Sequence, residues 1–174
     1  MNAIVQDLKR AADSMPAVRL VRGDAVTLEP VRWAWPGYLP RGMLTILGGA
    51  PGSGKTTIAL SLTATMTRAG TRPDASRCTT AGDALIWSGE DAHPVIAARL
   101  AAAGADMSRV HFVDGVTGGY ADGTFDPGRD MLLLEAAAEK LPNLQLLILD
   151  PIVSAVAGDS HKNAEVRRSL QPVV

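Results

Sequence analysis

Eight consecutive residues fit the pattern G-x-x-x-x-G-K-[ST], the strongest chemical signal in this sequence. In this pattern the glycines let backbone N–H groups curl around phosphate oxygens, and the following helix adds the positive end of its dipole. The lysine reaches the β- and γ-phosphates, and the last hydroxyl binds Mg²⁺. A plain glycine-rich turn is the alternative, but four fixed positions rarely match by accident. We expect ATP with Mg²⁺ to bind at Gly49, Ala50, Pro51, Gly52, Ser53, Gly54, Lys55, Thr56 and Thr57.

An aspartate closes an apolar run later in the chain. Residues 144–149 are almost wholly apolar, and Asp150 follows them directly. In P-loop proteins an acidic group at the end of such a strand helps to hold the metal. The signal is weak alone, because many buried strands end in an aspartate that caps a helix or turn. Downstream of a sound phosphate loop, we favour Asp150 as a metal ligand together with Thr56.

Two further carboxylates, Glu90 and Asp91, follow the short apolar run at residues 84–88. The carboxyl ends of strands are the edge at which open α/β sheets bind ligands. Glu90 is therefore our candidate general base, which would polarise the attacking water, and it joins Lys55 as a candidate catalytic residue. For Asp91 we favour a cap of the next helix over catalysis.

The elements that must position these residues alternate along the chain. The phosphate loop lies between an expected strand at 43–47 and an expected helix at 55–68. The elements expected after it, strand first and then helix in turn, are 84–88, 94–103, 110–113, 131–140 and 144–149. Apolar strands that alternate with helices indicate an α/β fold with a mostly parallel sheet flanked by helices.

The remaining segments carry weaker signals. Apolar spacing predicts a short N-terminal helix that ends near Pro16, and prolines with Gly37 predict irregular structure over residues 21–42. Residues 70–82 read as a surface loop, and residues 115–128 read equally well as a nucleic-acid-binding loop or as a plain exposed connection. We expect an N-terminal helix and lead-in over residues 1–30 and a core over residues 31–174.

Composition sets limits on partners and location. The 174 residues suit one core, and 17 basic against 18 acidic side chains give a net charge of −1. A nucleic-acid or membrane partner would therefore need a local patch. The single cysteine, Cys78, cannot form an internal disulfide, and no apolar stretch approaches the roughly 20 residues that cross a bilayer. We expect a soluble cytoplasmic protein with no membrane partner.

Several residues with possible functions are better explained by structure. His93 and His111 show no metal-ligand spacing with Cys78, so we propose no zinc site. Trp33 and Trp35 are candidates for stacking on adenine, but a place at the edge of the core is more typical. A basic cluster near the C-terminus could face nucleic acid or another subunit, although a solvated face is the commoner role: His161, Lys162, Arg167 and Arg168.

The order of several short motifs resembles the AAA_25 group of RecA-like ATPases. The motifs are residues 33–37 and 41–45, the phosphate loop, and residues 88–91, 99–100, 103–106 and 149–151. This group includes hexameric plasmid replicative helicases of the RepA type and many ATPases of phages and mobile elements. The resemblance implies a RecA-like P-loop NTPase in which Glu90 is the catalytic base and Asp150 the Walker B carboxylate. It also implies Mg²⁺-dependent ATP hydrolysis in DNA replication or as a helicase, a hexameric homo-oligomer and single-stranded DNA as a partner.

The sequence departs from that group after Asp150. In RecA-like ATPases a strand with a polar sensor residue follows the Walker B strand and lies between it and the phosphate-loop strand. Here residues 151–174 remain, and residues 165–170 read as a helix stopped by Pro172. We therefore expect a core that is incomplete at its C-terminal side, without the later basic residue that reaches a neighbour's γ-phosphate.

Two other functions stay open. The phosphate loop also resembles that of adenylate kinases, which favours a small-molecule kinase. Against this, those kinases carry the loop near the N-terminus and have glycine where Thr56 stands, and no arginine-rich lid is visible. The third possibility is a non-catalytic, nucleotide-responsive assembly module, which the expected absence of a central strand favours.

Overall fold

The computed structural model describes residues 18–118 and 123–152. The helices expected before Pro16 and at 165–170, and the C-terminal basic cluster, lie outside this part. The chain divides into two units, residues 1–30 and Val31–Val174. In the first unit the described residues contain one 3-10 turn, η1 (Gly23–Ala25), beside which Arg22 pairs with Asp24 (Nη2–Oδ2, 2.6 Å).

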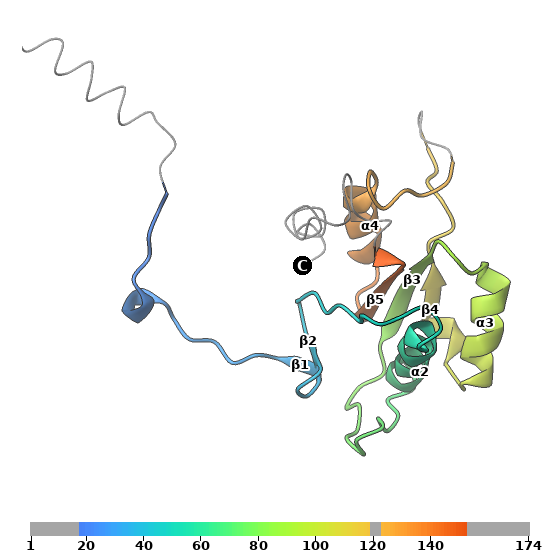
Figure 1. Ribbon diagram of the computed structural model, residues 1–174, viewed down its shortest axis with the longest axis horizontal. Helices are drawn as coiled ribbons and strands as arrows, with labels where there is room; N and C mark the ends of the chain where they lie inside the picture. The colour runs from blue at the N-terminus through green and yellow to red at the C-terminus, as the bar shows by residue number, and fades with distance from the viewer. Residues whose placement is uncertain (1–17, 119–122, 153–174) are drawn as a thin grey trace, which may run out of the picture. The chain divides into compact units, whose positions relative to one another are not determined.

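A three-stranded parallel sheet forms the centre of the second unit (Figure 1). Its strands are β3 (Asp83–Ser88), β4 (Val110–Phe112) and β5 (Leu144–Asp150), in the order β4-β3-β5. The middle strand is the most buried, as expected for an apolar strand covered on both faces. The predicted α/β class with a parallel sheet is therefore confirmed.

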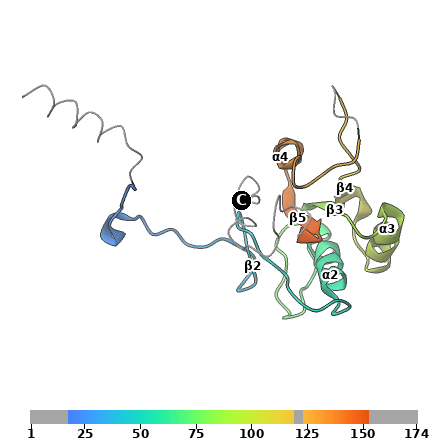
Figure 2. The same cartoon turned by 45° about the horizontal axis from the view of Figure 1, so that its top comes forward.

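Helices cover both faces of this sheet: α2 (Lys55–Thr67), α3 (His93–Ala102) and α4 (Met131–Ala138) (Figure 2). Side chains of β3 alternate between the faces. Ile86 packs with the residues of α2 and α3, whereas Leu85 and Trp87 pack with those of α4. In the part of the chain that the structure describes, none of these helices has the length and apolarity to span a bilayer.

The local sequence explains why α2 begins and ends where it does. Gly54 precedes it in the left-handed region (φ 84°), and no glycine or proline interrupts it. Thr63 and Thr65, both buried, satisfy their hydroxyls by donating to carbonyls four residues earlier, at 2.9 Å each. After the helix, Gly70 N–H returns to the Thr65 carbonyl at 2.8 Å, which closes the C-terminus.

The prediction of a strand at residues 43–47 is wrong. Residues 43–50 belong to no strand, and Met43, Leu44, Ile46 and Leu47 are 40–58% exposed. A strand needs a neighbour to receive its backbone hydrogen bonds. Within residues 18–118 and 123–152, β5 pairs only with β3, so residues 43–47 have no ladder partner.

The irregular lead-in expected at 21–42 is also wrong in part, because it contains an antiparallel hairpin. Its strands are β1 (Trp33–Trp35) and β2 (Leu39–Pro40), joined by a tight turn in which Gly37 has φ 77° and Tyr38 N–H donates to the Trp35 carbonyl at 3.0 Å. Proline followed by glycine is the usual centre of such a turn. The core role expected for Trp33 is wrong as well, since that residue is 41% exposed.

The two loops are more ordered than their composition indicates. In the loop at 70–82, Arg72 and Cys78 are buried because the β1–β2 hairpin covers them. In the second loop, Val116 bridges to Gly123, and Phe125 joins the core beside α4. Loops rich in glycine and proline can therefore contribute core residues, although their sequence shows no apolar period.

Candidate functional site

The phosphate loop, residues 49–54, leads directly into α2 and is tightly curled. Gly52 and Gly54 have φ values of 75° and 84°, a region that side chains disfavour. At Gly49 an added Cβ would lie 2.8 Å from Ser53 Oγ, so the Ser53 hydroxyl would have to shift to admit a side chain there. These glycines give the loop the shape in which backbone N–H groups can surround an anion.

Lys55 lies at the start of α2 with its ammonium group turned back over the loop. Its Nζ donates to the carbonyls of Gly49 and Ala50, at 3.0 Å each. Phosphate oxygens are stronger acceptors than these carbonyls because they are charged. The ammonium is thus placed where a bound phosphate would compete for its protons.

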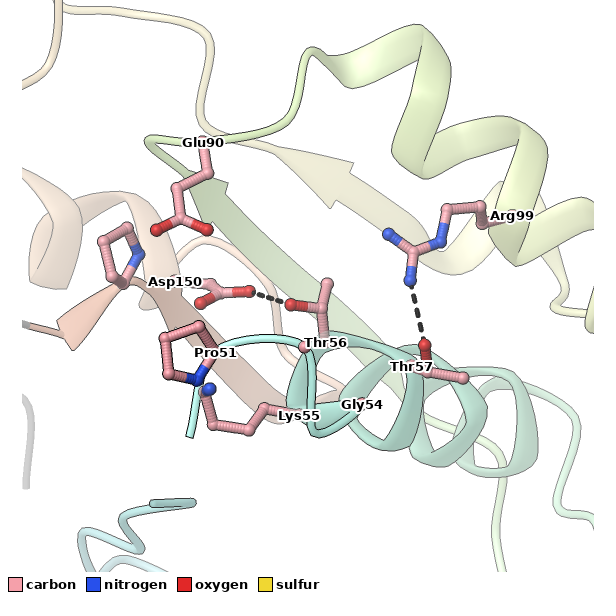
Figure 3. Close-up of a pocket in the computed structure, with 10 residues that line it drawn as sticks. Pro51, Gly54, Lys55, Thr56, Thr57, Glu90, Arg99 and Asp150 are labelled. Atoms are coloured by element: carbon pink, nitrogen blue, oxygen red, sulfur yellow. Dashed lines mark hydrogen bonds between the residues drawn. The ribbon is translucent and has the colours of Figure 1, made fainter. Parts of the chain in front are cut away.

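Thr56 and Asp150 come together although 94 residues separate them in the sequence. The Thr56 hydroxyl donates to Asp150 Oδ2 at 2.7 Å, at the carboxyl end of β5 (Figure 3). Mg²⁺ prefers hard oxygen ligands and is commonly bound by one or two carboxylates together with substrate phosphates and water. Among the described residues no group of three or more His, Cys, Asp or Glu side chains could hold a metal. The threonine–aspartate pair fits Mg²⁺ held jointly with a nucleotide.

Glu90 faces the same pocket from the end of β3 (Figure 3). Gly89 N–H donates to the Asp150 carbonyl at 2.8 Å, which ties the ends of β3 and β5 together. The Glu90 carboxylate is exposed and makes no hydrogen bond with any residue in the described ranges. The pocket has a volume of about 430 Å³ and is lined by Pro51, Gly52, Gly54, Lys55, Thr56, Thr57, Glu90, Arg99, Asp150 and Pro151.

Asp91 does not cap the next helix, so that expectation is wrong. The N-cap of α3 is Ala92, and no side chain caps it. The Asp91 carboxylate instead accepts from Arg99 Nη1 at 3.1 Å, and its own N–H donates to Ser88 Oγ at 3.0 Å. A charged guanidinium donates a stronger hydrogen bond than a neutral backbone N–H group, which explains why Asp91 pairs with Arg99 and does not cap α3.

Arg99 is the charged pocket residue to which the sequence alone gives no role. Its Nη2 donates to Thr57 Oγ1 at 3.1 Å, so one guanidinium links α3, α2 and the loop after β3 (Figure 3). A helical repeat would have placed Arg99 one turn after the buried Ile96, beside the face that packs on α2. The helical repeat does not show that α2 is the element on which this face of α3 packs.

The other candidate ligands are not brought together. His93 Nδ1 lies 3.4 Å from Asp114 Oδ1, and its ring stacks on Phe112 with centroids 5.0 Å apart. Cys78 is buried in a different cluster, with Ala34. The site therefore consists of the phosphate loop and the ends of β3 and β5, with Arg99 at one side.

Comparison with known proteins gives one match. A family model described as an AAA domain, AAA_25, matches residues 9–174. None of the curated proteins and none of the solved structures matches the chain. The match covers the phosphate loop, the sheet and the three helices described above, and such families are nucleotide-binding ATPase types. This chain belongs to the AAA_25 family of P-loop ATPase-type domains.

Proposed function

We propose that this protein binds ATP with Mg²⁺ and hydrolyses it. The observation that carries the proposal is the 2.7 Å hydrogen bond between Thr56 and Asp150, in a pocket that also holds Lys55 and Glu90. A cation for the phosphates, two oxygen ligands for Mg²⁺ and a free carboxylate are the groups that ATP hydrolysis needs.

Each group has a proposed role. The N–H groups of the loop and Lys55 bind the β- and γ-phosphates, and Thr56 with Asp150 would hold Mg²⁺, which neutralises charge on the phosphate oxygens. Glu90 accepts a proton from the attacking water. The water oxygen bonds to the γ-phosphorus as the bond to the β,γ-bridging oxygen breaks, which leaves ADP and inorganic phosphate. Arg99 adds a cation beside Thr57 and orients the nucleotide.

By its resemblance, the wider role is that of a motor in DNA replication, as a helicase of a plasmid, phage or mobile element. Such a motor would assemble as a homo-oligomer and act on single-stranded DNA. A small-molecule kinase would instead need a phosphate acceptor, and a nucleotide-responsive assembly module would bind ATP without turnover. The three functions differ in what they do after ATP has bound.

The test measures binding and turnover separately on residues 1–174. Isothermal calorimetry should show ATP binding that weakens when EDTA removes Mg²⁺. Phosphate release is then followed with malachite green, with and without single-stranded DNA, and loss of ATP is followed with candidate phosphate acceptors. Slow phosphate release that DNA accelerates supports the motor. Transfer to a small acceptor would support the kinase, and binding without any release the assembly module.

We expect turnover to be slow in this chain. Among the described residues, two cations line the pocket, Lys55 and Arg99. Where a further arginine reaches the transferring phosphoryl group, it contributes a factor of about 10³ to 10⁵ in rate. Turnover of several per second, inside the usual enzyme range, from a monodisperse sample would show that the pocket is complete as it stands.

A further inference from the structure

The β1–β2 hairpin exposes aromatic rings that the core does not use. The chain has three tryptophans, two tyrosines and two phenylalanines, and three of these residues lie within six positions of one another: Trp33, Trp35 and Tyr38. Tyr38 is 63% exposed and Trp33 is 41% exposed. Exposed aromatic side chains that gather in one short segment often mark a contact surface.

The three residues of β1 differ in burial: Trp33 is exposed, Ala34 is buried and Trp35 is half-buried. Ala34 points inward, 2% exposed, and packs on Met66 and Cys78. Trp33, on one side of Ala34, is exposed, whereas Trp35 lies beyond an irregularity in the strand register, is half-buried and lines a hollow with Ile58 and Leu62 of α2. The Tyr38 ring leans on Trp35 with centroids 4.6 Å apart and an interplanar angle of 37°. We call Trp33, Trp35 and Tyr38 the aromatic face.

The hairpin is anchored from below, so its aromatic face is held in place. Arg72, which is 6% exposed, donates through Nη2 to the Ala34 carbonyl and through Nη1 to Ser76 Oγ. Trp35 Nε1 donates to Asp74 Oδ2 at 2.8 Å, which fixes the indole. Rings that are already oriented lose little entropy on binding a partner.

Two arginines flank the aromatic face. Arg32 and Arg41 are cross-strand neighbours, since Arg41 N–H donates to the Arg32 carbonyl at 2.7 Å. Residues 32–41 contain no carboxylate, and across the described ranges neither guanidinium has an ion-pair partner. The nearby Asp74 is occupied by bonds from Trp35 and Ser76. Like charges side by side are destabilising, and an anionic partner relieves the repulsion.

We propose that the aromatic face, with Arg32 and Arg41, binds single-stranded nucleic acid. Bases stack on Trp33 and Tyr38, and the two guanidinium groups contact backbone phosphates. Stacked rings beside cations are the chemistry by which proteins bind single strands, whereas the bases of a duplex keep their faces covered. The proposal rests on the nucleic-acid role proposed above and gives that role a surface outside the phosphate pocket.

The test is anisotropy of fluorescein-labelled oligothymidylate titrated with the full chain at low salt without nucleotide. Trp33→Ala and Tyr38→Ala should each weaken binding about tenfold, within the range for loss of one stacked base. Trp33→Phe and Tyr38→Phe keep a ring and should stay near wild type. Quenching of tryptophan fluorescence by the oligonucleotide should shrink in Trp33→Phe, because the indole that stacks is gone.

The arginines are tested through salt. The double variant Arg32→Ala, Arg41→Ala should flatten the plot of log affinity against log salt by about 0.7 per lost phosphate contact. Lys140→Glu changes the net charge equally at an exposed position beyond α4 and is the matched control. Oligouridylate in parallel titrations separates RNA from DNA, and tighter binding of either supports the proposal.

Three results would overturn the proposal. One is no binding of either oligonucleotide to the wild-type chain, and another is equal binding by the alanine variants and wild type. The third is unchanged binding with altered sedimentation in those variants, which would make the aromatic face a protein contact. Lys55→Ala should bind oligothymidylate as wild type does, so failure of the ATP proposal is recognised separately.

Discussion

At the scale of single residues, Lys55 carries the largest expected effect on nucleotide binding. It is the fixed cation of the phosphate loop, with Nζ 3.0 Å from two loop carbonyls. Lys55→Ala removes that charge from the β- and γ-phosphates, so ATP affinity should be lost or greatly weakened. Isothermal calorimetry in Mg²⁺ buffer measures the effect, with Lys140→Ala as a control that keeps the pocket intact. Equal affinities of Lys55→Ala and wild type would refute the role.

Glu90 should affect turnover and leave binding alone. Its carboxylate lines the pocket without a hydrogen-bond partner among the residues described, so the charge is available to accept a proton from water. Glu90→Gln should bind ATP nearly as wild type and hydrolyse it about 10²-fold more slowly, the range that a positioned base supplies. Single-turnover phosphate release in an active assembly is the measurement. Normal hydrolysis would move the base elsewhere, with Asp91 the next candidate.

At the scale of elements, the turn before α4 links stability to pH through Asp130. Its buried carboxylate accepts from Arg129 Nη2 at 2.7 Å and from Asp126 N–H at 2.9 Å, and these bonds lower the pKa of Asp130 from 3.8 to about 2. Because folding lowers this pKa, the Asp130 carboxylate stabilises the folded state fully at pH values above its unfolded pKa of 3.8. The stabilisation is lost as the pH falls through the folded pKa of about 2.

Asp130→Asn should therefore lower the urea midpoint at neutral pH. The difference from wild type should shrink as the pH falls from 3.8 to about 2, where the wild-type carboxylate also becomes neutral. Urea unfolding across this range measures the effect. Glu135→Gln, an exposed position on α4, is the control. A difference that is constant with pH would show that Asp130 acts through packing and not through its charge.

Most elements of the core could be predicted from local pattern. The helix after the phosphate loop and the strands around Ile86 and Leu147 begin and end close to the expected residues. The strand predicted at residues 43–47 is wrong because a run of apolar residues does not show whether a neighbouring strand is present to pair with it. The hairpin was missed because its strands have three and two residues, too short for any period.

The candidate site was predictable to the same degree. The phosphate loop is a continuous motif, and the rule that ligands bind at the carboxyl ends of strands placed Glu90 and Asp150 at one edge. The structure brings both to the pocket that Lys55 lines. The place of Arg99 in the site was not predicted because its partners, Asp91 and Thr57, lie on other elements. A contact of that kind depends on how helices pack, which short-range pattern does not encode.

At the scale of the whole molecule, exposed apolar surface should drive association. Residues 43–47 hold four large apolar side chains that are 40–58% exposed, and β5 is an edge strand within the described residues. Unpaired edges and apolar patches favour contacts between chains. Leu44→Lys should therefore shift sedimentation velocity profiles toward monomer, with ATP affinity unchanged. Leu132→Lys, which replaces a leucine 67% exposed on α4, is the control and should shift them less.

The hydrogen bond between Thr56 and Asp150 also sets an order of events during folding. It joins residues 94 positions apart, so the chain must close a long loop before the two oxygens meet. The phosphate loop and α2 are contiguous and can form early, whereas Thr56 and Asp150, the proposed metal ligands, pair only when β5 has docked on β3. In refolding, affinity for phosphates should thus precede the dependence on Mg²⁺, and the delay between them times the closure of the sheet.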